Sequence, residues 1–382
     1  MWDDLSDRHK QVRETARRFA DEVLAPRAAR IDAEHIFPRE EMQALAKLGF
    51  LGMLVPEALG GSGLGNQGLV LALEEVNRAC ASTGVTMSVH NSLATGPIVR
   101  FGNEAQKAKY LPRLARGEWL GAYSLTEPGS GSDAASLIAT ARRDGDHYVL
   151  NGVKVFVTTG GEADLVILFA RTGTDASQRA KGVSCFIVEA AWKGCRAGKP
   201  EEKLGIRGSN TVTLYLEELK VPAENLLGEE GKGFSIAMDT LDGGRIGIAT
   251  QALGIARACL DECVRLVKGS TEGGGEMRES GAVTGRIAEM ATDVDAARLL
   301  IHRAATLRDR KAPHGKEAAM AKLFASQVAN RAAREAVQIA GMAGYTGASP
   351  VERFLRDAKI TEIYEGTTEI QKLVISRVLL RE

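Results

Sequence analysis

Apolar residues recur every three or four positions through the first third of the chain, and this spacing predicts amphipathic helices. Ser6 and Asp7 stand where a helix cap is expected at the start of the first such segment. Proline and glycine separate the segments from one another. The four helical segments expected within an N-terminal helical domain, residues 1–121, are 6–33, 38–53, 69–82 and 103–118.

The period changes to two in the middle of the chain, where β-branched and aromatic residues are frequent. Asn151-Gly152 lies between two such runs, and this dipeptide is a strong signal for a tight hairpin turn. Residues 122–229 are therefore expected to form an antiparallel β-barrel or sandwich. Its further strands are expected in residues 163–171, 182–190 and 210–222.

Helical spacing returns after residue 229 and continues to the end. One predicted helix aligns Met290, Val294, Ala297 and Ile301 along a single face. The expected fold is thus α+β and multidomain, with residues 230–382 forming an antiparallel four-helix bundle. The stretch 267–281, "VKGSTEGGGEMRESG", interrupts this region, and its glycines predict a flexible loop.

Composition excludes several classes of function. The 382 residues hold 49 Lys plus Arg and 49 Asp plus Glu, so nothing suggests binding to nucleic acid. No segment is long and apolar enough to cross a membrane. The five cysteines are scattered and form no CxxC pair, which predicts reduced thiols and a cytoplasmic location, without a metal site. The N-terminus is acidic and lacks the apolar core of a targeting segment.

Four short stretches carry candidate chemistry, and each is weak alone. Gly63-Leu64-Gly65-Asn66-Gln67-Gly68 matches GxGxxG, but no strand precedes it, so a loop is favoured over a nicotinamide site. Residues 123–133, "YSLTEPGSGSD", combine hydroxyls and glycines that let backbone approach a polar ligand. Residues 242–245, "DGGR", place an acid and an arginine on one helix face, which indicates either a solvated ion pair or a close approach of a ligand at the two glycines. Glu365 follows apolar residues, so it is either a surface residue or a general base.

Taken together, these stretches resemble the acyl-CoA dehydrogenase family, closest to its short-chain (butyryl-CoA) branch. The resemblance covers nearly the whole chain. Its specific pieces occur in family order, and they are "SVHNSL", "YSLTEPGSGSD", "KLGIRGSNT", "LDGGRIGIA" and "RDAKITEIYEGTTEIQ".

The resemblance implies flavin-dependent oxidation of a fatty acyl-CoA thioester to the trans-2-enoyl-CoA. Glu365 would remove the α-proton, a hydride would pass to N5 of FAD, and the N–H of Glu365 would help to polarise the thioester. The implied FAD-binding residues are Tyr123, Ser124, Leu125, Thr126, Ser132, Phe156, Val157, Thr158, Gln338, Gly341, Thr367, Thr368 and Glu369. The implied substrate-binding residues are Ser132, Asp242, Gly243, Gly244, Arg245 and Gly366.

The likeness also bears on the acyl group, the electron acceptor and the assembly. Family members that act on dicarboxylic glutaryl-CoA carry an arginine where this chain has Gly84, so a short or branched monocarboxylic acyl chain is expected. An electron-transfer flavoprotein is the implied acceptor. The implied assembly is a homotetramer, as a dimer of dimers, or a homodimer.

The sequence departs from the family at the adenine end of FAD. Ser270, Gly273 and Gly281 replace an arginine, a phenylalanine and a glutamine, and Met342 replaces a glycine. Phe156 replaces a tryptophan beside the flavin ring, which is a mild change. Losing one charged contact and one stacking ring weakens FAD binding by about two to three orders of magnitude. The alternative to the FAD-dependent dehydrogenase is therefore a homologue without FAD, which either performs non-redox chemistry on acyl-CoA or only binds it.

Overall fold

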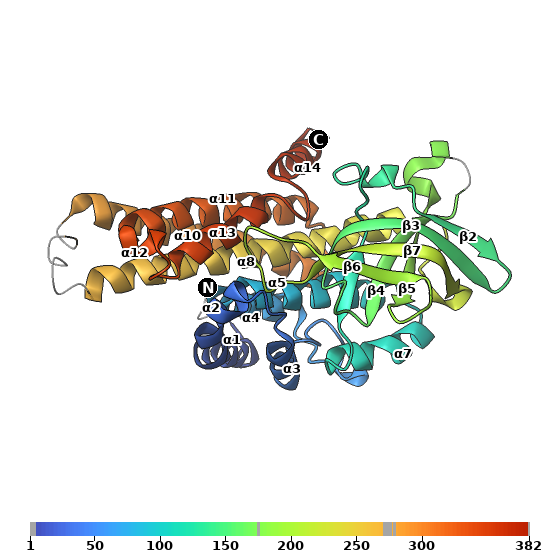
Figure 1. Ribbon diagram of the computed structural model, residues 1–382, viewed down its shortest axis with the longest axis horizontal. Coiled ribbons are helices and arrows are strands. Elements are labelled where there is room, and N and C mark those ends of the chain that lie inside the picture. The colour runs from blue at the N-terminus through green and yellow to red at the C-terminus, as the bar shows by residue number, and fades with distance from the viewer. Residues whose placement is uncertain (1–4, 174–175, 270–276, 278–279, 381–382) are drawn as a thin grey trace.

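The computed structural model describes residues 5–173, 176–269, 277 and 280–380. The sheet occupies one end of the elongated molecule, and the long helices extend away from it to the other end (Figure 1). The shorter N-terminal helices lie along one side of both parts. A division of the chain after residues 121 and 229 stays a prediction.

The N-terminal part is helical, as its apolar spacing predicts. Ser6 caps the first helix, because its side chain accepts a hydrogen bond from the His9 N–H. Asn103 and Gln106 form a capping box at the start of the last one. The helices are α1 (Asp7–Phe19), α2 (Ala25–Ala33), α3 (Arg39–Lys47), α4 (Gly65–Ala79), α5 (Ala81–Ser88), α6 (Gly96–Phe101) and α7 (Glu104–Ala115). Two π-helical turns, Ala20–Leu24 and Val89–Thr95, connect α1 to α2 and α5 to α6.

The middle part is a single eight-stranded sheet with the order β6-β7-β3-β2-β4-β5-β8, in which β1 pairs with β4. Most neighbours are antiparallel, but β1 and β2 each run parallel to β4. The sheet is therefore mixed rather than purely antiparallel. Its strands are β1 (Gly121–Ser124), β2 (Thr140–Asp144), β3 (His147–Thr158), β4 (Leu165–Arg171), β5 (Val183–Glu189), β6 (Cys195–Pro200), β7 (Thr211–Pro222) and β8 (Leu226–Leu227).

The hairpin expected at Asn151-Gly152 is wrong, because β3 continues through both residues. The register against β7 shifts between Leu150 and Gly152, so this glycine marks a β-bulge. The chain reverses instead at Gly145-Asp146, between Asp144 and His147, which pair across the turn. Gly145 has a φ of +62°, which suits a tight hairpin turn. The local asparagine-glycine signal thus gives way to pairing along the whole of β3.

The C-terminal part is built on three long helices, α8 (Gly233–Gly269), α10 (Gly281–Asp309) and α11 (Gly315–Ala340), with α13 (Val351–Lys359) against α11. Alanine supplies much of their shared core, which lets the helices approach closely. Helix α4 packs against α8 and so joins the N-terminal part to the bundle. The short helix α12 (Met342–Tyr345) follows α11.

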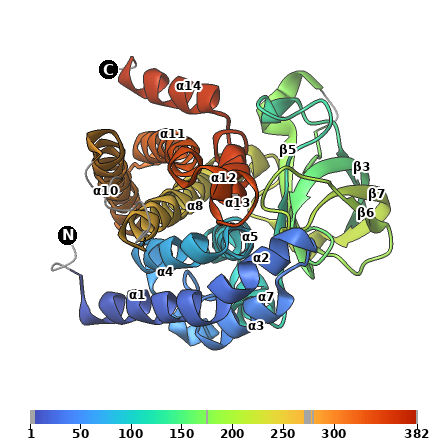
Figure 2. The same cartoon turned by 60° about the vertical axis from the view of Figure 1, so that its left-hand side comes forward.

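The C-terminal helix α14 (Thr368–Leu379) departs from the expected bundle. It contacts α11 but stands clear of α8 and α10 (Figure 2). Gln371 is its only buried residue among those that the structure describes. The flexible loop expected over 267–281 falls mainly on residues 270–276, 278 and 279, which lie outside the described part of the chain.

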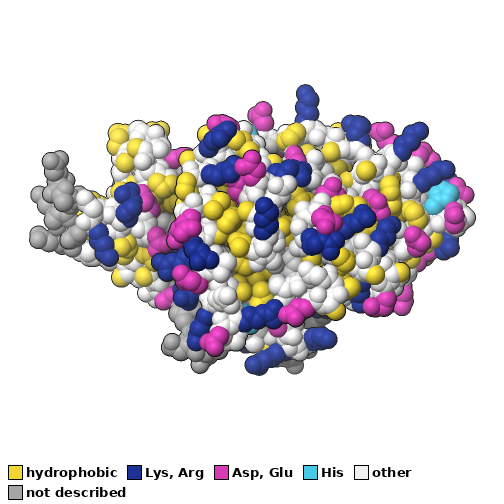
Figure 3. All heavy atoms as spheres, turned by 90° about the horizontal axis from the view of Figure 1, so that it is seen from below, with side chains coloured by type: hydrophobic (Ala, Val, Ile, Leu, Met, Phe, Trp, Pro, Cys, Tyr) yellow, Lys and Arg dark blue, Asp and Glu magenta, His cyan; other side chains and the backbone are white. Residues whose placement is uncertain are grey.

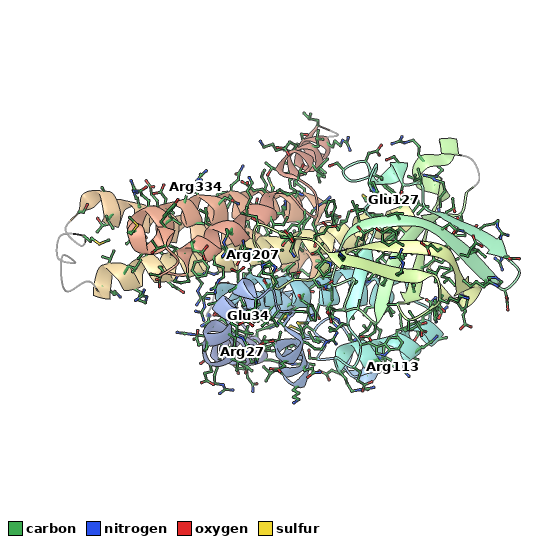
Figure 4. The ribbon with its side chains drawn as sticks, viewed as in Figure 1. Arg27, Glu34, Arg113, Glu127, Arg207 and Arg334 are labelled. Atoms are coloured by element: carbon green, nitrogen blue, oxygen red, sulfur yellow. The ribbon has the colours of Figure 1, made fainter. Side chains whose placement is uncertain are left out.

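The loop that carries "KLGIRGSNT" joins the sheet to α13. The Ile206 N–H donates to the buried carboxylate of Asp357. A Cβ atom at Gly205 would lie 2.2 Å from the carbonyl oxygen of Arg356, so this crossing requires glycine. Arg207 lies where the strands meet the helices (Figure 4). The contact fixes the position of α13, and therefore of the segment that follows it, relative to the sheet.

Replacing Gly205 by alanine tests this crossing. Because the new methyl group meets backbone rather than a flexible side chain, we expect Gly205→Ala to lower the free energy of unfolding by about 1–3 kcal/mol. Urea denaturation measures the change. The matched control is Gly285→Ala, since nothing lies within 4 Å of a Cβ at Gly285 in α10. Better helix propensity should make that variant neutral or more stable by up to about 1 kcal/mol. Equal stability of the two variants would contradict the close crossing.

Candidate active site

Glu365 lies in a sharp turn between the 3₁₀-turn Ile360–Glu362 and α14. Its φ of +49° is in the left-handed region and is followed by +92° at Gly366. A non-glycine residue in this region costs on the order of 1–3 kcal/mol. The carboxylate reaches α8, where a Cβ atom at Gly244 would lie 1.9 Å from its Oε2 atom. Glycine at position 244 is therefore what allows the carboxylate to occupy this place.

The carboxylate of Glu365 is buried, and its Oε2 atom has no hydrogen-bond partner in the described structure. Burial raises the pKa of this carboxyl to about 8, although the positive charges of Lys322 and Arg245 oppose the rise. A buried acid without a partner is uncommon and points to a group that acts on a ligand. Of the two interpretations of Glu365 given by the sequence, the general base fits this environment.

Asp242 and Arg245 lie one turn apart on α8, as their spacing predicts. The Nη1 atom of Arg245 donates to Oδ1 of Asp242 over 2.5 Å. Burial raises the pKa of Asp242, and the positive charge of Arg245 is the largest influence that opposes the rise. The two intervening glycines permit close contacts, because a Cβ at Gly243 would lie 2.8 Å from the Arg308 guanidinium. The DGGR motif is thus a packed, charged segment of α8 rather than a solvated ion pair.

Buried side chains fill the space beyond Glu365. The Tyr364 hydroxyl donates to the Gln251 side chain, whose amide donates to the Ala81 carbonyl oxygen over 3.1 Å. Leu93, in the π-helix that carries "SVHNSL", lies within 2.8 Å of a Cβ position at Gly244. These groups join α8, α5 and the π-helix close to the carboxylate.

The "YSLTEPGSGSD" segment follows β1 and approaches the same region from the sheet. The hydroxyls of Tyr123 and Ser124 are buried and have no partner among the described residues. Burial raises the pKa of Tyr123 well above its usual value, and the negative charge of Glu365 adds to the rise, so the two groups lie near each other. Leu125 is buried, Thr126 is half-buried and Ser132 is exposed.

A buried ion pair holds this segment against β3. Lys154 donates to Oε1 of Glu127 over 2.7 Å and to the Leu125 carbonyl oxygen over 3.1 Å. Glu127 also accepts from the backbone N–H groups of Ile138 and Ala139. Both ends of the loop are therefore fixed at one carboxylate, which lies beside the sheet (Figure 4). Lys154 was not among the predicted residues, although a lysine at an inward position of an alternating strand is a detectable signal.

Phe156, Val157 and Thr158 form the end of β3. Phe156 has a φ of +56° and is 66% exposed, whereas Val157 is buried. The next residue, Thr159, was not singled out from the sequence, yet its hydroxyl is buried without a partner in the described structure. Asn210 accepts hydrogen bonds from the N–H groups of Thr159 and Gly161, so the "KLGIRGSNT" loop also fixes this strand end.

The residues predicted to bind FAD do not all meet within one chain. Thr367 caps α14 beside the Glu365 turn, with Thr368 and Glu369 following it. Gln338 and Gly341 are exposed at the far end of α11. Gly366 contacts Lys322 near the start of that helix, and the 16 residues from Lys322 to Gln338 span about 24 Å along the helix axis. Gln338 and Gly341 therefore lie far from the other predicted FAD-binding residues within one chain.

Gly63 and Leu64 of the GxGxxG stretch lie in the loop that the sequence predicts, whereas its last four residues, 65–68, form the first turn of α4. Its helix terminus is already capped, because Asp309 accepts hydrogen bonds from the N–H groups of Asn66 and Gln67. A carboxylate therefore occupies the position where a phosphate would bind. No group of ligands suitable for a metal ion occurs among the described residues.

Comparisons with known proteins agree with this arrangement. Models of the acyl-CoA dehydrogenase N-terminal, middle and C-terminal domains match residues 6–118, 122–219 and 231–380. The chain belongs to the acyl-CoA dehydrogenase family. It is 49% identical over 378 residues to a mitochondrial short-chain specific acyl-CoA dehydrogenase of Mus musculus, covering 99% of this chain and 91% of that one.

Two solved structures give the same result. Butyryl-CoA dehydrogenase of Megasphaera elsdenii superposes with a TM-score of 0.96 at 43% identity, over 99% of both chains. A chain in a structure of the electron transferring flavoprotein of Acidaminococcus fermentans gives 0.97 at 45% identity, also over 99% of both chains. The chain is thus a flavin-dependent acyl-CoA dehydrogenase with the expected α+β fold.

The residues that face the acyl-CoA dehydrogenase site fit FAD, which this family uses. The unpartnered hydroxyls of Tyr123, Ser124 and Thr159 offer hydrogen bonds to the polar edge of a flavin ring. The exposed ring of Phe156 offers an aromatic face. Nothing at this end supports the alternative of a homologue that has lost FAD. At the adenine end, a Cβ at Gly281 has open space around it, and Met342 is 74% exposed.

The Lys154–Glu127 pair generates a prediction about stability. Lys154→Met leaves the Glu127 carboxylate buried without a cation, so we expect the free energy of unfolding to fall by about 3–5 kcal/mol. Urea denaturation of the purified protein measures the loss. Lys220→Met, at an exposed position of β7, is the matched control and should change stability by less than about 0.5 kcal/mol. A Lys154 variant as stable as this control would show that the pair does not hold the loop.

Proposed function

We propose that Glu365 is the base of this acyl-CoA dehydrogenase and removes the α-proton of a short, monocarboxylic acyl-CoA. The observation that carries the proposal is the buried, unpartnered Oε2 atom of Glu365 against Gly244. A thioester placed along this glycine of α8 brings its α-carbon to the carboxylate. Glu365 then accepts the proton while the β-carbon loses a hydride, and the product is the trans-2-enoyl-CoA.

The backbone of the same turn is suited to polarise the thioester. Within the described structure, neither the N–H of Glu365 nor that of Gly366 donates a hydrogen bond to protein. A free N–H beside the base stabilises negative charge that develops on the thioester oxygen when the α-proton leaves. Asp242 and Arg245 hold the CoA thioester portion next to this turn, and Ser132 reaches it from the sheet.

In this proposal three segments hold the flavin ring: Tyr123 to Thr126, Ser132, and Phe156 to Thr158. The unpartnered hydroxyls of Tyr123 and Ser124 donate or accept hydrogen bonds directly. Thr367 to Glu369 meet its pyrophosphate end at the N-terminus of α14, where backbone N–H groups favour an anion. Bound FAD supplies the two-electron acceptor for the β-carbon hydride. An electron-transfer flavoprotein is the proposed onward acceptor, in line with the solved relative named above.

An acyl chain without a distal carboxylate fits the residue at position 84. A Cβ at Gly84 would lie 2.0 Å from the Asn77 side chain, so this position offers no cation to a distal carboxylate. A short chain is proposed because the relatives that the chain resembles are named short-chain specific acyl-CoA dehydrogenases. All five cysteines are free, which supports a reducing, cytoplasmic location. No helix within the described residues could cross a membrane.

Glu365→Gln tests the base. The amide keeps the shape but cannot accept the proton, so kcat should fall by about 10²–10⁴-fold while FAD remains bound. Reduction of the flavin absorbance by butyryl-CoA in a stopped-flow instrument measures the rate. Glu202→Gln, an exposed change in the loop after β6, serves as control. Full activity of the Glu365 variant, or purified protein that no added FAD turns yellow, would refute the proposed function.

The pH profile of the wild-type enzyme supplies a second readout of the same base. Only the ionised carboxylate accepts a proton, and burial raises the pKa of Glu365 to about 8 in the free protein. We therefore expect kcat/KM to rise with pH and level off above about pH 8, with an acid limb that falls about tenfold per pH unit. A profile flat between pH 6 and 9 would contradict this assignment.

The proposed assembly is a homodimer or a homotetramer, in which Gln338 and Gly341 of one copy complete the FAD site of another. Apolar side chains of and just after helix α14 are exposed. On the face in Figure 3, by contrast, basic and acidic side chains are interspersed. Another copy that covered the apolar side chains would remove an apolar surface from water. The exposed side chains are Leu373, Val378, Leu379 and Leu380.

Leu373→Glu tests this surface, because it places a charge on the proposed interface. We expect smaller assemblies by sedimentation velocity and weaker FAD binding, since Gln338 and Gly341 then lack a neighbouring site. Leu48→Glu, at a partly exposed leucine after α3, is the control. Unchanged sedimentation of the Leu373 variant would exclude α14 from the interface.

A further inference from the structure

Lys322 is a buried lysine that the chemistry described so far does not use. It lies on α11 among alanines of the bundle core and has no exposed surface. Its Nζ atom donates to the carbonyl oxygen of Gly366 over 2.8 Å. Among the described residues no carboxylate lies within ion-pair distance of it. A buried ammonium without an ion pair is costly, so its place beside the Glu365 turn calls for a functional explanation.

Gln371 reaches the same turn from the first part of α14. Its Nε2 atom donates to the Gly366 carbonyl oxygen over 2.8 Å and to the Glu365 carbonyl oxygen over 3.2 Å. The Gly366 carbonyl therefore accepts from two buried donors on two helices. Both carbonyls of the left-handed turn are held toward α11 and α14. These bonds offset the strain of the positive φ at Glu365, and the carboxylate stays directed at Gly244.

Charged groups from several elements surround the Glu365 carboxylate. Lys322 on α11 and Arg245 on α8 are the cations that favour its ionised form, in that order. Two tyrosines also lie there, Tyr123 on β1 and Tyr364 next to Glu365 in the chain. Burial raises the pKa values of both hydroxyls, so they stay neutral. Burial lowers the pKa of Lys322 to about 8, although the negative charges of Glu365, of Glu362 on the preceding turn and of Glu369 on α14 oppose the fall. Arg245 already pairs with Asp242, whereas Lys322 has no ion-pair partner in the described structure.

We propose that Lys322 is a positioning residue of the dehydrogenation: its ammonium group fixes the Glu365–Gly366 turn and supplies the unpaired positive charge that faces the base. The inference rests on the proposed role of Glu365. It assigns two separable effects to one side chain, a hydrogen bond that sets geometry and a charge that favours the ionised carboxylate. Gln371 contributes only the first of these, because its amide is neutral.

This difference gives a test with a matched set of variants. Lys322→Met removes both the donor and the charge, so we expect kcat to fall by about 10–100-fold and the acid limb of the kcat/KM profile to move up by about one pH unit or more. The sign follows because loss of a nearby cation disfavours the ionised base. Gln371→Leu removes a donor only, so kcat should fall while the acid limb stays in place. Lys322→Arg keeps the charge and should also leave the acid limb in place.

Controls separate this inference from folding and from the proposed function. Each variant is measured as FAD-loaded protein with wild-type circular dichroism, and Lys220→Met on β7 reports any general effect of losing a lysine. If the wild type is active and folded Lys322→Met keeps the acid limb at its wild-type pH, the inference about Lys322 is overturned, while the proposed function stands. A wild type without dehydrogenase activity refutes the proposed function itself. If Lys322→Met does not fold, the other two variants decide. The inference is overturned if Lys322→Arg and Gln371→Leu both have the same kcat as the wild type.

Discussion

The site depends on one close contact, in which the carboxylate of Glu365 lies against a glycine of α8. A side chain at position 244 would occupy the place of this carboxylate, so glycine is required there. The carboxylate is directed to this place by the left-handed backbone conformation at Glu365. Burial then removes water from the carboxylate and raises its pKa. A carboxyl group with a pKa near the working pH is suited to take an α-proton. Backbone conformation and packing, rather than a catalytic partner, thus give the proposed base its environment.

The rest of the fold maintains this contact from three directions. Helix α8 supplies the glycine, and α11 and α14 hold the carbonyls of the turn. The sheet is tied to the same region through Ile206 and Asp357, so β1 and the end of β3 are fixed relative to the base. A buried ion pair then closes the loop after β1. Flavin and acyl group can therefore meet between two parts of the chain that the core joins firmly.

The fold and the main chemistry could be predicted from the sequence to a large extent. Helical spacing identified α4, α7, α10 and α11, because long amphipathic helices keep their period whatever their partners are. The motif around Glu365 indicated the proposed base through its resemblance to a family. The turn at Asn151-Gly152 failed because a hairpin signal is local, whereas β3 is held along its length by β2 and β7. Lys154 and Thr159 were missed because burial is a property of the packed structure. Lys154 pairs with Glu127 away from water, and the Thr159 hydroxyl is buried without a partner among the described residues.

The sequence by itself determined the order of the three parts, the helical and extended periods, and the residues able to carry proton transfer. It did so because side-chain periodicity and residue chemistry are local. Only the tertiary structure decided that α14 stands off the bundle, that Gln338 lies about 24 Å along α11 from the base turn, and that Lys322 faces Glu365. These facts depend on how distant segments pack, and burial and electrostatic fields arise only when such segments come together. The glutamate was visible in the sequence, and packing made its environment.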